Sequence, residues 1–397
     1  MQDGRLHLYD RGKDRPLYGC GGDSRPMSNT AIRILHAADF HLDSPFENLT
    51  AEKAAQRRAE QRQLLRRLTQ EAAGRQVQIV LLSGDLFDSA ACFRQTEEEL
   101  RDALRALQVP VFIAPGNHDC VLPGSPYLTL TWPENVHIFT EHRLQCVPVP
   151  ELGVRVWGAA FTDIESQNML EGFEAVKQPD TLDLMVIHGQ AGQPESRYNP
   201  VRKEDILRSG MDYIAFGHSH RESGLLQEGE TWYAWPGCPE GRGFDETGEK
   251  YIYFLELSET DCRLEKCSIA QRCYRVLHVD MSGEADPVQT LPPREETYRD
   301  ICRLVLEGEI DEPLDIPSLY RTLEDRFYAL EIRDKTRARK DLWQGAEQDT
   351  LRGLFLQKLR QQYDQAESDE DRKRIRSAAE WGIAALDNRE VTADDYS

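Results

Sequence analysis

Five stretches of the chain share one pattern, in which a run of apolar, often β-branched residues is followed at once by polar residues. They are "AIRILHAADFH", "VQIVLLSGDLFD", "VPVFIAPGNHD", "LDLMVIHG" and "MDYIAFGHSH". Near-continuous apolar runs of this length are typical of strands that are buried on both faces. We therefore predict five buried strands, each with polar side chains at its carboxyl end.

Segments with helical periodicity lie between some of these runs. The stretch "TAEKAAQRRAEQRQLLRRLTQEAAG" carries an apolar stripe and ends in glycine, as amphipathic helices commonly do. "TEEELRDALRALQ", which stops before Pro110, and the short "RKEDILRSG" predict two more helices. This alternation of strand and helix predicts a layered α/β core.

Two other regions contain strands and turns with little helix. Residues 136–161 and 231–257 include "HIFTEHRLQCVPV", "VRVWGAAF", "TWYAWPG" and "YIYFLEL". Such strands add to the sheet of the core. We therefore predict two packed sheets with helices on their outer faces.

The pattern changes after Arg272. "RLVLEGEI", "SLYRTLEDRF" and "YALEIRDKT" predict a strand, a helix and a strand, and residues 349–387 predict one or two amphipathic helices. We expect a main domain over residues 29–272 and a smaller α+β and helical region over 273–397. Residues 1–28 show no periodicity, and we expect there either a disordered tail or an upstream extension of a chain whose natural start is Met27.

Composition limits the classes of protein that fit. The 397 residues are 40% hydrophobic and 29% charged, which is typical of a globular protein, and no apolar run reaches the roughly 18 residues that span a bilayer. The nine cysteines are scattered without Cys-x-x-Cys spacing, which predicts reduced thiols in the cytoplasm. A net charge of −21 argues against a protein that coats nucleic acid by itself. A polyanionic substrate would require bound cations, a local basic patch or a partner.

The polar residues after the five strands are uniform in type, and half of the ten histidines in the chain are among them. They are Asp39, His41, Asp85, Asp88, Asn117, His118, Asp119, His188, His218 and His220. The carboxyl ends of strands are where α/β sheets place their ligands, so these side chains are expected at a single rim.

Carboxylate and imidazole side chains in such number suit two divalent cations, which need a bridging carboxylate and several neutral ligands. Mixed ligands of this kind favour manganese, iron or zinc over magnesium. If the segments are extended, Asp39 and His41 point the same way, as do His218 and His220. Taken singly, each residue is more simply read as structural. His36, for example, has the opposite parity to Asp39 and is interpreted as buried structure.

The motifs "DFH", "GDLFD", "GNHD", the isolated "HG" and "GHSH" resemble the signature of calcineurin-like metallophosphoesterases. The resemblance covers roughly residues 32–257. The neighbouring "HAADFHLDSPF" and "YAWPGCPEGRGFDETGEKYIYFLEL" are similar to the YhaO-type branch of the SbcD-like DNA repair exonucleases. "FYALEIRDKTR" and "LRGLFLQKL" also resemble that branch, though less specifically.

The resemblance implies a four-layer α-β-β-α sandwich with a two-metal site that activates water for attack on phosphorus. It assigns one manganese to Asp39, His41 and His220, and the other to Asn117, His188 and His218, with iron or zinc as alternatives. Asp85 would bridge the two ions, and His118 would act as general acid on the leaving oxygen. Asp88 and Asp119 would orient ligands and loops. In archaeal and eukaryotic relatives a histidine often replaces Asp88, so no direct catalytic role is assigned to it.

Several functions compete with DNA hydrolysis. Phosphoprotein phosphatases of this superfamily typically carry Arg where Ser89 stands and Glu where Asp119 stands, so that class is disfavoured. A phosphodiesterase for small molecules or cyclic nucleotides stays open, although the region after Arg272 favours a larger substrate. A non-catalytic adaptor fits poorly because every expected ligand is present, and a structural zinc protein would use more cysteine.

The carboxy-terminal helices have two interpretations. Arg352, Lys358, Arg360 and the "DRKRIR" run could form a DNA or partner face, or simply a solvated helix face. The SbcD resemblance implies docking on the coiled coil of an SbcC-like ATPase, and it also implies a homodimer. The apolar residues with helical spacing that could serve docking are Leu351, Leu354, Phe355 and Leu359. The sequence thus predicts a cytoplasmic, metal-dependent DNA phosphodiesterase, an exonuclease in DNA repair that works with an ATPase.

Overall fold

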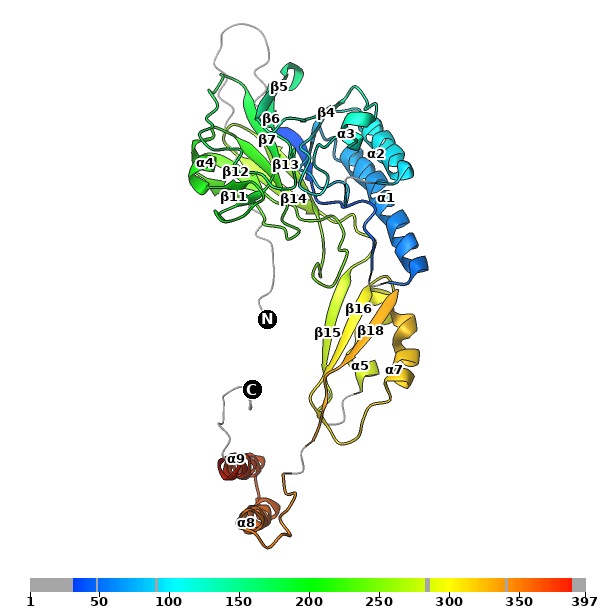
Figure 1. Cartoon of the computed structure of the whole chain (residues 1–397), viewed down its shortest axis with the longest axis vertical. Coiled ribbons are helices and arrows are strands. Elements are labelled where there is room, and N and C mark those ends of the chain that lie inside the picture. The colour runs from blue at the N-terminus through cyan, green and yellow to red at the C-terminus, as the bar shows by residue number, and fades with distance from the viewer. Residues whose placement is uncertain (1–30, 48, 90–91, 283–285, 340–341, 388–397) are drawn as a thin grey trace. The chain divides into compact units, whose positions relative to one another are not determined.

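The computed structural model describes residues 31–47, 49–89, 92–282, 286–339 and 342–387 (Figure 1). The extension expected over residues 1–28 lies outside the described residues. Two six-stranded sheets form the core, in agreement with the prediction of two packed sheets.

The first sheet has the strand order β14-β13-β1-β2-β3-β4. Strands β1 to β4 are parallel, whereas β13 is antiparallel to β1 and β14 is antiparallel to β13. The bounds of these strands are β1 (Ile32–Ala37), β2 (Ile79–Leu82), β3 (Val111–Ile113), β4 (Val136–Ile138), β13 (Ile252–Leu257) and β14 (Cys262–Cys267).

The second sheet has the order β11-β12-β10-β7-β6-β5. Its four central strands are parallel, and β5 and β11 form antiparallel edges. The bounds are β5 (Gln145–Val149), β6 (Val154–Gly158), β7 (Leu182–His188), β10 (Tyr213–Gly217), β11 (Leu226–Glu228) and β12 (Thr231–Ala234). The run "HIFTEHRLQCVPV" is therefore divided between the sheets, since β4 ends the first and β5 ends the second.

Successive side chains along each strand point to opposite faces, so apolar residues cover both faces of each sheet. On β1, Ile34 packs between the two sheets with Val186 of β7, while Leu35 packs against Leu64 of α1 (Ala51–Gly74). Helix α2 (Arg94–Leu107) packs beside α1, and Figure 1 shows both on the side of the first sheet.

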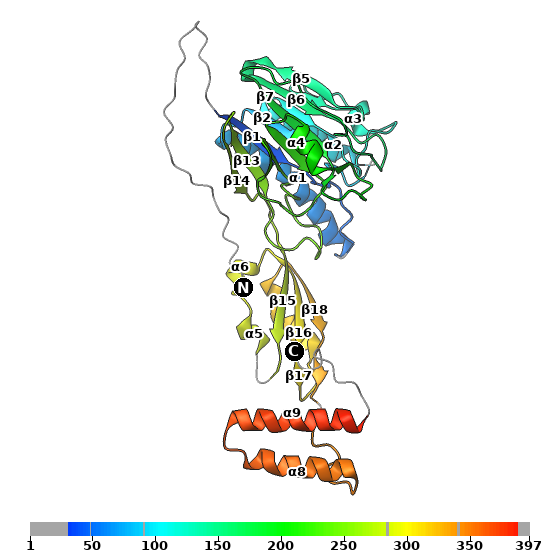
Figure 2. The same cartoon turned by 90° about the vertical axis from the view of Figure 1, so that its left-hand side faces the viewer.

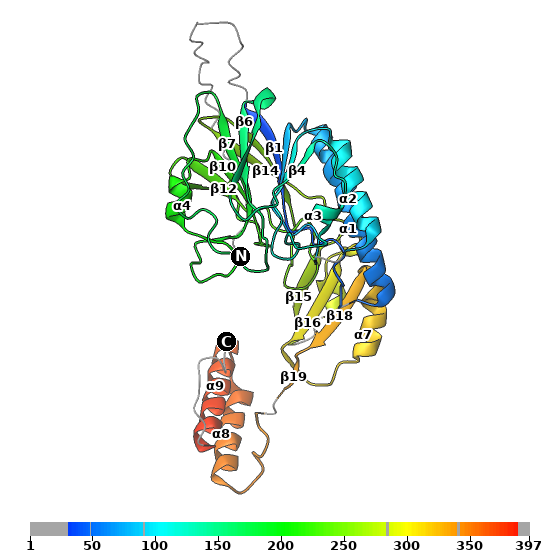
Figure 3. The ribbon, with the colours of Figure 1, turned by 45° about the horizontal axis from the view of Figure 1, so that its top comes forward.

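The outer face of the second sheet packs against α4 (Lys203–Arg208), which lies on the opposite side of the sandwich in Figure 3. The expected four-layer α-β-β-α sandwich is confirmed. Short elements complete this part of the chain: α3 (Pro126–Thr129), η1 (Pro150–Leu152), β8 (Gln190–Ala191) and β9 (Pro200–Val201).

The region after Arg272 contains a three-stranded sheet with the order β15-β16-β18. Its strands are β15 (Tyr274–Asp280), β16 (Ile301–Glu307) and β18 (Ala329–Asp334). The other elements are α5 (Pro287–Thr290), α6 (Arg294–Thr297), β17 (Glu309–Ile310), α7 (Ile316–Leu323), η2 (Glu324–Arg326) and β19 (Arg337–Ala338). The predicted order of strand, helix and strand is present as β16, α7 and β18.

The chain divides into two compact units. The first holds the described residues up to 277 together with 292–304 and 321–331, and the second holds 278–291, 305–320 and the described residues from 332 onward. Within the second unit, α8 (Leu351–Gln365) and α9 (Asp369–Leu386) lie side by side (Figure 2). None of the described helices combines the length and the apolar character that crossing a membrane requires.

Candidate metal centre

The ten predicted polar residues lie at or just after the carboxyl ends of β1, β2, β3, β7 and β10. Strands β1, β2 and β3 are parallel neighbours in one sheet, and β7 and β10 are parallel neighbours in the other. Both sheets therefore deliver their polar residues to the same end of the sandwich. The side chains gather in two halves, which we call the first half (Asp39, His41 and His220) and the second half (Asn117, His188 and His218).

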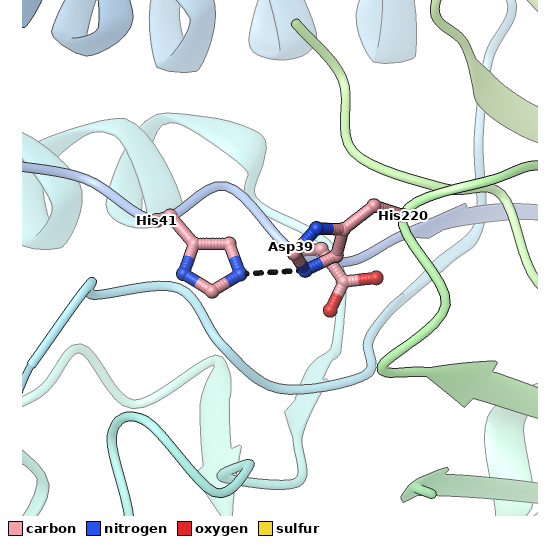
Figure 4. Close-up of side chains that lie close together, drawn as sticks. All are labelled: Asp39, His41 and His220. Carbon is pink, nitrogen blue, oxygen red and sulfur yellow. Dashed lines mark hydrogen bonds between the residues drawn. The ribbon is translucent and has the colours of Figure 1, made fainter. Parts of the chain in front are cut away.

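In the first half, the Nε2 atoms of His41 and His220 lie 3.1 Å apart. Ligand atoms of these two histidines and of Asp39 lie within 4.8 Å of one another. Figure 4 shows a nitrogen of each imidazole ring facing the other beside the Asp39 carboxylate, and the two ring planes are inclined by 77°. Two ligands that are each about 2.1 Å from one ion lie about 3 Å apart at a right angle, so the spacing fits a shared cation.

The outer ring nitrogens of this half define which nitrogens face inward. His220 Nδ1 donates to Glu246 Oε1 at 2.7 Å, and His41 Nδ1 lies 3.2 Å from Asp88 Oδ1. When Nδ1 donates, the neutral ring keeps its lone pair on Nε2. In the neutral rings the two Nε2 lone pairs, 3.1 Å apart, can both bind one cation, whereas without a cation a proton on one Nε2 makes the hydrogen bond to the other.

The second half has the same character. Asn117 Oδ1 lies 3.0 Å from His188 Nε2 and 3.1 Å from His218 Nδ1. His188 Nδ1 donates to the carbonyl oxygen of Ser83 at 2.8 Å, which leaves a lone pair on Nε2 of the neutral ring. In the neutral ring, which is the form that binds a metal, the Nε2 lone pair and the Asn117 amide oxygen lie 3.0 Å apart, close enough to contact one cation.

Asp85 lies between the halves. Its Oδ2 atom is 3.4 Å from His188 Nε2 and 3.6 Å from His41 Nε2, and its side chain is almost completely buried. Asp85, Asp39 and His188 also form a group whose ligand atoms lie within 4.8 Å. A carboxylate in this position can contact a cation in either half.

The electrostatics also favour bound positive charge. Burial raises the pKa of Asp39 to about 6, although His188 and His220 oppose the shift. Burial would raise the pKa of Asp85 as well, but His188 and His41 hold it well below its usual range. Burial would lower the pKa of His188, yet Asp85 and Asp39 raise it to about 9. Buried carboxylates need a counter-charge, and divalent cations supply it.

The backbone is in the left-handed region at four of these residues. The φ angles are 54° at Asp39, 43° at His41, 51° at Asp85 and 96° at His218. Such conformations cost about 1–3 kcal/mol each and concentrate at functional sites. Extended segments were expected from the sequence at these residues, and the positive φ angles show that the expectation was wrong. The left-handed turns place His218 in the second half and His220 in the first.

Asp119 holds the loops on which the centre is built. Its carboxylate accepts from the backbone N–H groups of Asp85, Leu86, Phe87 and Gly116, and from the Tyr127 hydroxyl at 2.6 Å. With its oxygens occupied in this way, Asp119 fixes the loop after β2 against the loop after β3.

Asp88 and His118 lie at the solvent side of the first half. Asp88 Oδ1 contacts His41 Nδ1, the Ser44 hydroxyl at 3.0 Å and the Arg242 guanidinium at 2.9 Å. Asp88, His41 and His118 form a third group that could hold a cation. Because Arg242 already neutralises Asp88, this group is a poorer cation site than the two halves.

His118 is exposed, unlike the other imidazoles of the centre. Its Nδ1 atom donates to the carbonyl oxygen of Asp88 at 3.1 Å, and its backbone N–H donates to Asp85 Oδ1 at 3.0 Å. The ring is thereby fixed with Nε2 available to a bound molecule.

Arg242 and Glu246 were not singled out from the sequence. Both lie in "CPEGRGFDETGEK", a loop after β12 in which no strand end marks them. The detectable signal was the pairing of acidic and basic residues among glycines. His36, by contrast, lies outside the centre, where its ring nitrogens contact the Tyr213 hydroxyl and the Phe216 carbonyl.

Comparison with known proteins finds relatives that share this part of the chain. Residues 32–222 match the model of the calcineurin-like phosphoesterase family. The uncharacterized metallophosphoesterase YhaO of Bacillus subtilis is 29% identical over 325 residues, which cover 76% of this chain and 78% of YhaO.

Two other relatives are more distant. The DNA double-strand break repair protein Mre11 of Methanosarcina acetivorans is 26% identical over 72% of this chain and 48% of its own length. The SbcD component of the nuclease SbcCD of Bacillus subtilis is 23% identical over 55% of this chain and 64% of its own length. Among solved structures, a dimetal phosphatase from Danio rerio is 13% identical with a TM-score of 0.40, over 60% of this chain and 96% of that one.

Proposed function

We propose that the chain is a hydrolase of phosphoesters and that it cleaves phosphodiester bonds in DNA, because residues 32–222 match the model of the calcineurin-like phosphoesterase family. The observation that carries the proposal is the pair of ligand halves on either side of the buried Asp85. The names of two relatives, a double-strand break repair protein and a nuclease component, support DNA as the substrate. The reaction would be exonucleolytic and would serve DNA repair.

The donor set fits two divalent ions. Asp39, His41 and His220 would hold one, Asn117, His188 and His218 the other, and Asp85 would contact both. When bound, such ions lower the pKa of water and neutralise charge on the phosphoryl oxygens. Imidazole and carboxylate donors favour manganese, with iron or zinc as alternatives.

His118 is the proposed catalytic acid. Its Nδ1 proton is held by the Asp88 carbonyl, so Nε2 is the atom that exchanges a proton with the leaving oxygen. Its backbone N–H binds Asp85, which couples the position of the acid to that of the bridging carboxylate.

A partner surface is proposed on the α8–α9 hairpin. Phe355 and Leu359 pack inside the hairpin with Leu356, so they serve its own core. Leu351 and Leu354 remain 74% and 56% exposed. We propose that these exposed residues dock on the coiled coil of an SbcC-like ATPase, which suits the name of one relative as part of the SbcCD complex.

One observation favours a second candidate function. The net charge of −21 disfavours binding of a long polyanion and suits a small phosphodiester, whose single charge the bound cations would neutralise.

The experiment follows degradation of end-labelled linear duplex DNA by chelator-stripped protein, with and without Mn²⁺. Bis-p-nitrophenyl phosphate serves as the small phosphodiester, and Asp85→Ala and His118→Ala are run beside His142→Ala, which alters an exposed histidine outside the centre. Shortening of DNA that requires Mn²⁺ and is lost only in the first two variants supports the proposal. Turnover of the small diester without any DNA cleavage transfers the assignment to the second candidate.

A further inference from the structure

The loop of residues 238–248 brings two charged side chains to the first half of the centre. Glu246 Oε1 accepts from His220 Nδ1 at 2.7 Å and also from the Arg242 guanidinium at 2.7 Å. Arg242 then reaches Asp88, which contacts His41. Each histidine of the first half is therefore oriented by a carboxylate that Arg242 holds in place.

A buried charge cluster anchors this loop. Arg57 on α1 is completely buried, and its guanidinium contacts Glu60 at 2.8 Å and Glu240 of the loop at 2.6 Å. Arg272 contacts Glu60 through two nitrogens, at 2.5 and 2.8 Å, and its backbone N–H donates to Glu240 at 2.9 Å. The charge cluster thus consists of Arg57, Glu60, Glu240 and Arg272, and its formal charges cancel.

The cluster reaches Arg242 through the chain itself. Arg57 lies near the carbonyl oxygen of Gly241 at 3.4 Å, directly before Arg242. The Arg242 backbone N–H donates to Glu246 at 2.8 Å. A shift of Glu240 or Arg57 therefore displaces the residues that orient His220 and His41.

The 238–248 loop and its charge cluster also contact residues that lie outside the family match of 32–222. The Arg272 guanidinium lies 3.3 Å from the centroid of the Tyr328 ring, and Arg303 lies 3.8 Å from that of Phe244. Phe244 also packs edge-on against Tyr274. The first half depends on contacts that the phosphoesterase domain alone does not supply.

A buried charge cluster is seldom explained by stability. Apolar replacements of a buried ion pair are often neutral or stabilising, whereas removal of one partner typically costs about 3–5 kcal/mol. In some proteins such a cluster fixes one geometry instead. Here the geometry that it fixes is that of the 238–248 loop.

The second half has a different support. The Nδ1 atom of His188 donates to the Ser83 carbonyl, and the His188 carbonyl accepts from Asn199 at 2.8 Å. Trp235 donates to the carbonyls of Gly189 and Gly217, beside the ends of β7 and β10. None of these described contacts involves the charge cluster.

We propose that Arg242 and Glu246 are positioning residues for the ion held by Asp39, His41 and His220, and that the charge cluster sets the affinity for that ion alone. The inference rests on the two-metal centre of the proposed function. It adds that the two ions are controlled separately, one by the core of the sandwich and one by the 238–248 loop.

The test is a Mn²⁺ titration of the stripped full chain, in which electron paramagnetic resonance measures free Mn²⁺. The double variant Arg57→Met/Glu240→Gln removes one charge of each sign and leaves Arg272 paired with Glu60. We expect one dissociation constant to rise about 10-fold, the lower end of the effect of losing an outer partner of a ligand, because the variant displaces Glu246 through the loop without removing it; the other constant should change less than about twofold. The matched control is Glu71→Gln, on the same helix as Arg57. It removes the half-exposed ion pair between Glu71 and Arg75, and it should change neither dissociation constant.

Glu246→Gln tests the same step if the double variant fails to fold in a thermal melt. It keeps an acceptor for His220 Nδ1 but removes the charge, and the same single constant should rise. Equal weakening of both ions, or of neither, overturns the inference while the proposed function stands. A wild-type chain that binds no Mn²⁺ overturns the two-metal centre itself, and the inference with it.

Discussion

The two halves of the candidate centre hold similar donors but are built differently. Asn117, His188 and His218 follow or end strands of the sandwich, and the backbone carbonyl of Ser83 orients His188. His41 and His220 are oriented by the carboxylates of Asp88 and Glu246, which Arg242 holds in place. A backbone carbonyl moves only with its strand, whereas a side-chain carboxylate moves with its loop. The geometry of the ligands in the first half can therefore change more easily than that in the second half.

Asp85 lies between the two halves, so its substitution should affect both of them and have the largest effect. Asp85→Asn keeps the shape and removes the charge. We expect loss of both Mn²⁺ ions in the titration, and a fall in kcat of about 10⁴-fold or more, since the ions contribute several kcal/mol to transition-state stabilisation. Retention of one tightly bound ion at full affinity would show that Asp85 belongs to one half only.

His118→Ala should separate chemistry from metal binding. The ring contacts the Asp88 carbonyl and offers Nε2 to a bound molecule, so its loss removes a proton donor. We expect kcat to fall about 10²- to 10⁴-fold while both Mn²⁺ dissociation constants stay unchanged. His142→Ala is the control for removal of an exposed imidazole. Weakened binding of either ion in His118→Ala would assign the residue to the metal centre rather than to proton transfer.

The same contrast explains what the sequence could and could not predict. The two sheets, the helices that cover them and the rim of ten polar residues followed from apolar runs that end in polar ones. Arg242 and Glu246 could not be found in this way, because their role depends on a fold that brings β10 and the loop after β12 together. The extended geometry assumed at Asp39 was wrong, since a left-handed turn is favoured there by contacts distant in sequence. One such contact is the bond from the Asp39 N–H to the Gly84 carbonyl.

Removal of the metal should lower the free energy of unfolding, and the size of the loss in a variant of one half shows how much the other half contributes. Binding at one hundred times the dissociation constant adds about 2.7 kcal/mol per site to the free energy of unfolding. Wild type should lose stability when a chelator removes Mn²⁺, because binding of the ions to the folded chain then no longer adds to the free energy of unfolding. In His220→Gln we expect part of this metal-dependent gain to persist, supplied by the second half. Thermal melts with and without Mn²⁺ measure it, and complete loss of the gain in His220→Gln would show that the halves are not separable.

The smallest expected effect concerns His36, which contacts the second half through Ser83. Its ring lies 3.0 Å from the Ser83 hydroxyl, and the Ser83 carbonyl binds His188. Burial lowers the pKa of His36 to about 3, although the Phe216 carbonyl opposes the shift. The unfolded chain, with an ordinary pKa near 6.5, therefore takes up a proton first as pH falls, and the folded state loses stability below about pH 6.5.

Between pH 7 and pH 5 this linkage amounts to about 2 kcal/mol, at 1.36 kcal/mol for each pH unit below the unfolded pKa. Urea unfolding of wild type and His36→Gln at both pH values measures it, because the variant lacks the titrating group. We expect the wild type to lose about 2 kcal/mol more than the variant over this interval. Parallel losses in the two proteins would mean that His36 is already protonated in the folded state, and that the second half is not supported by a neutral imidazole.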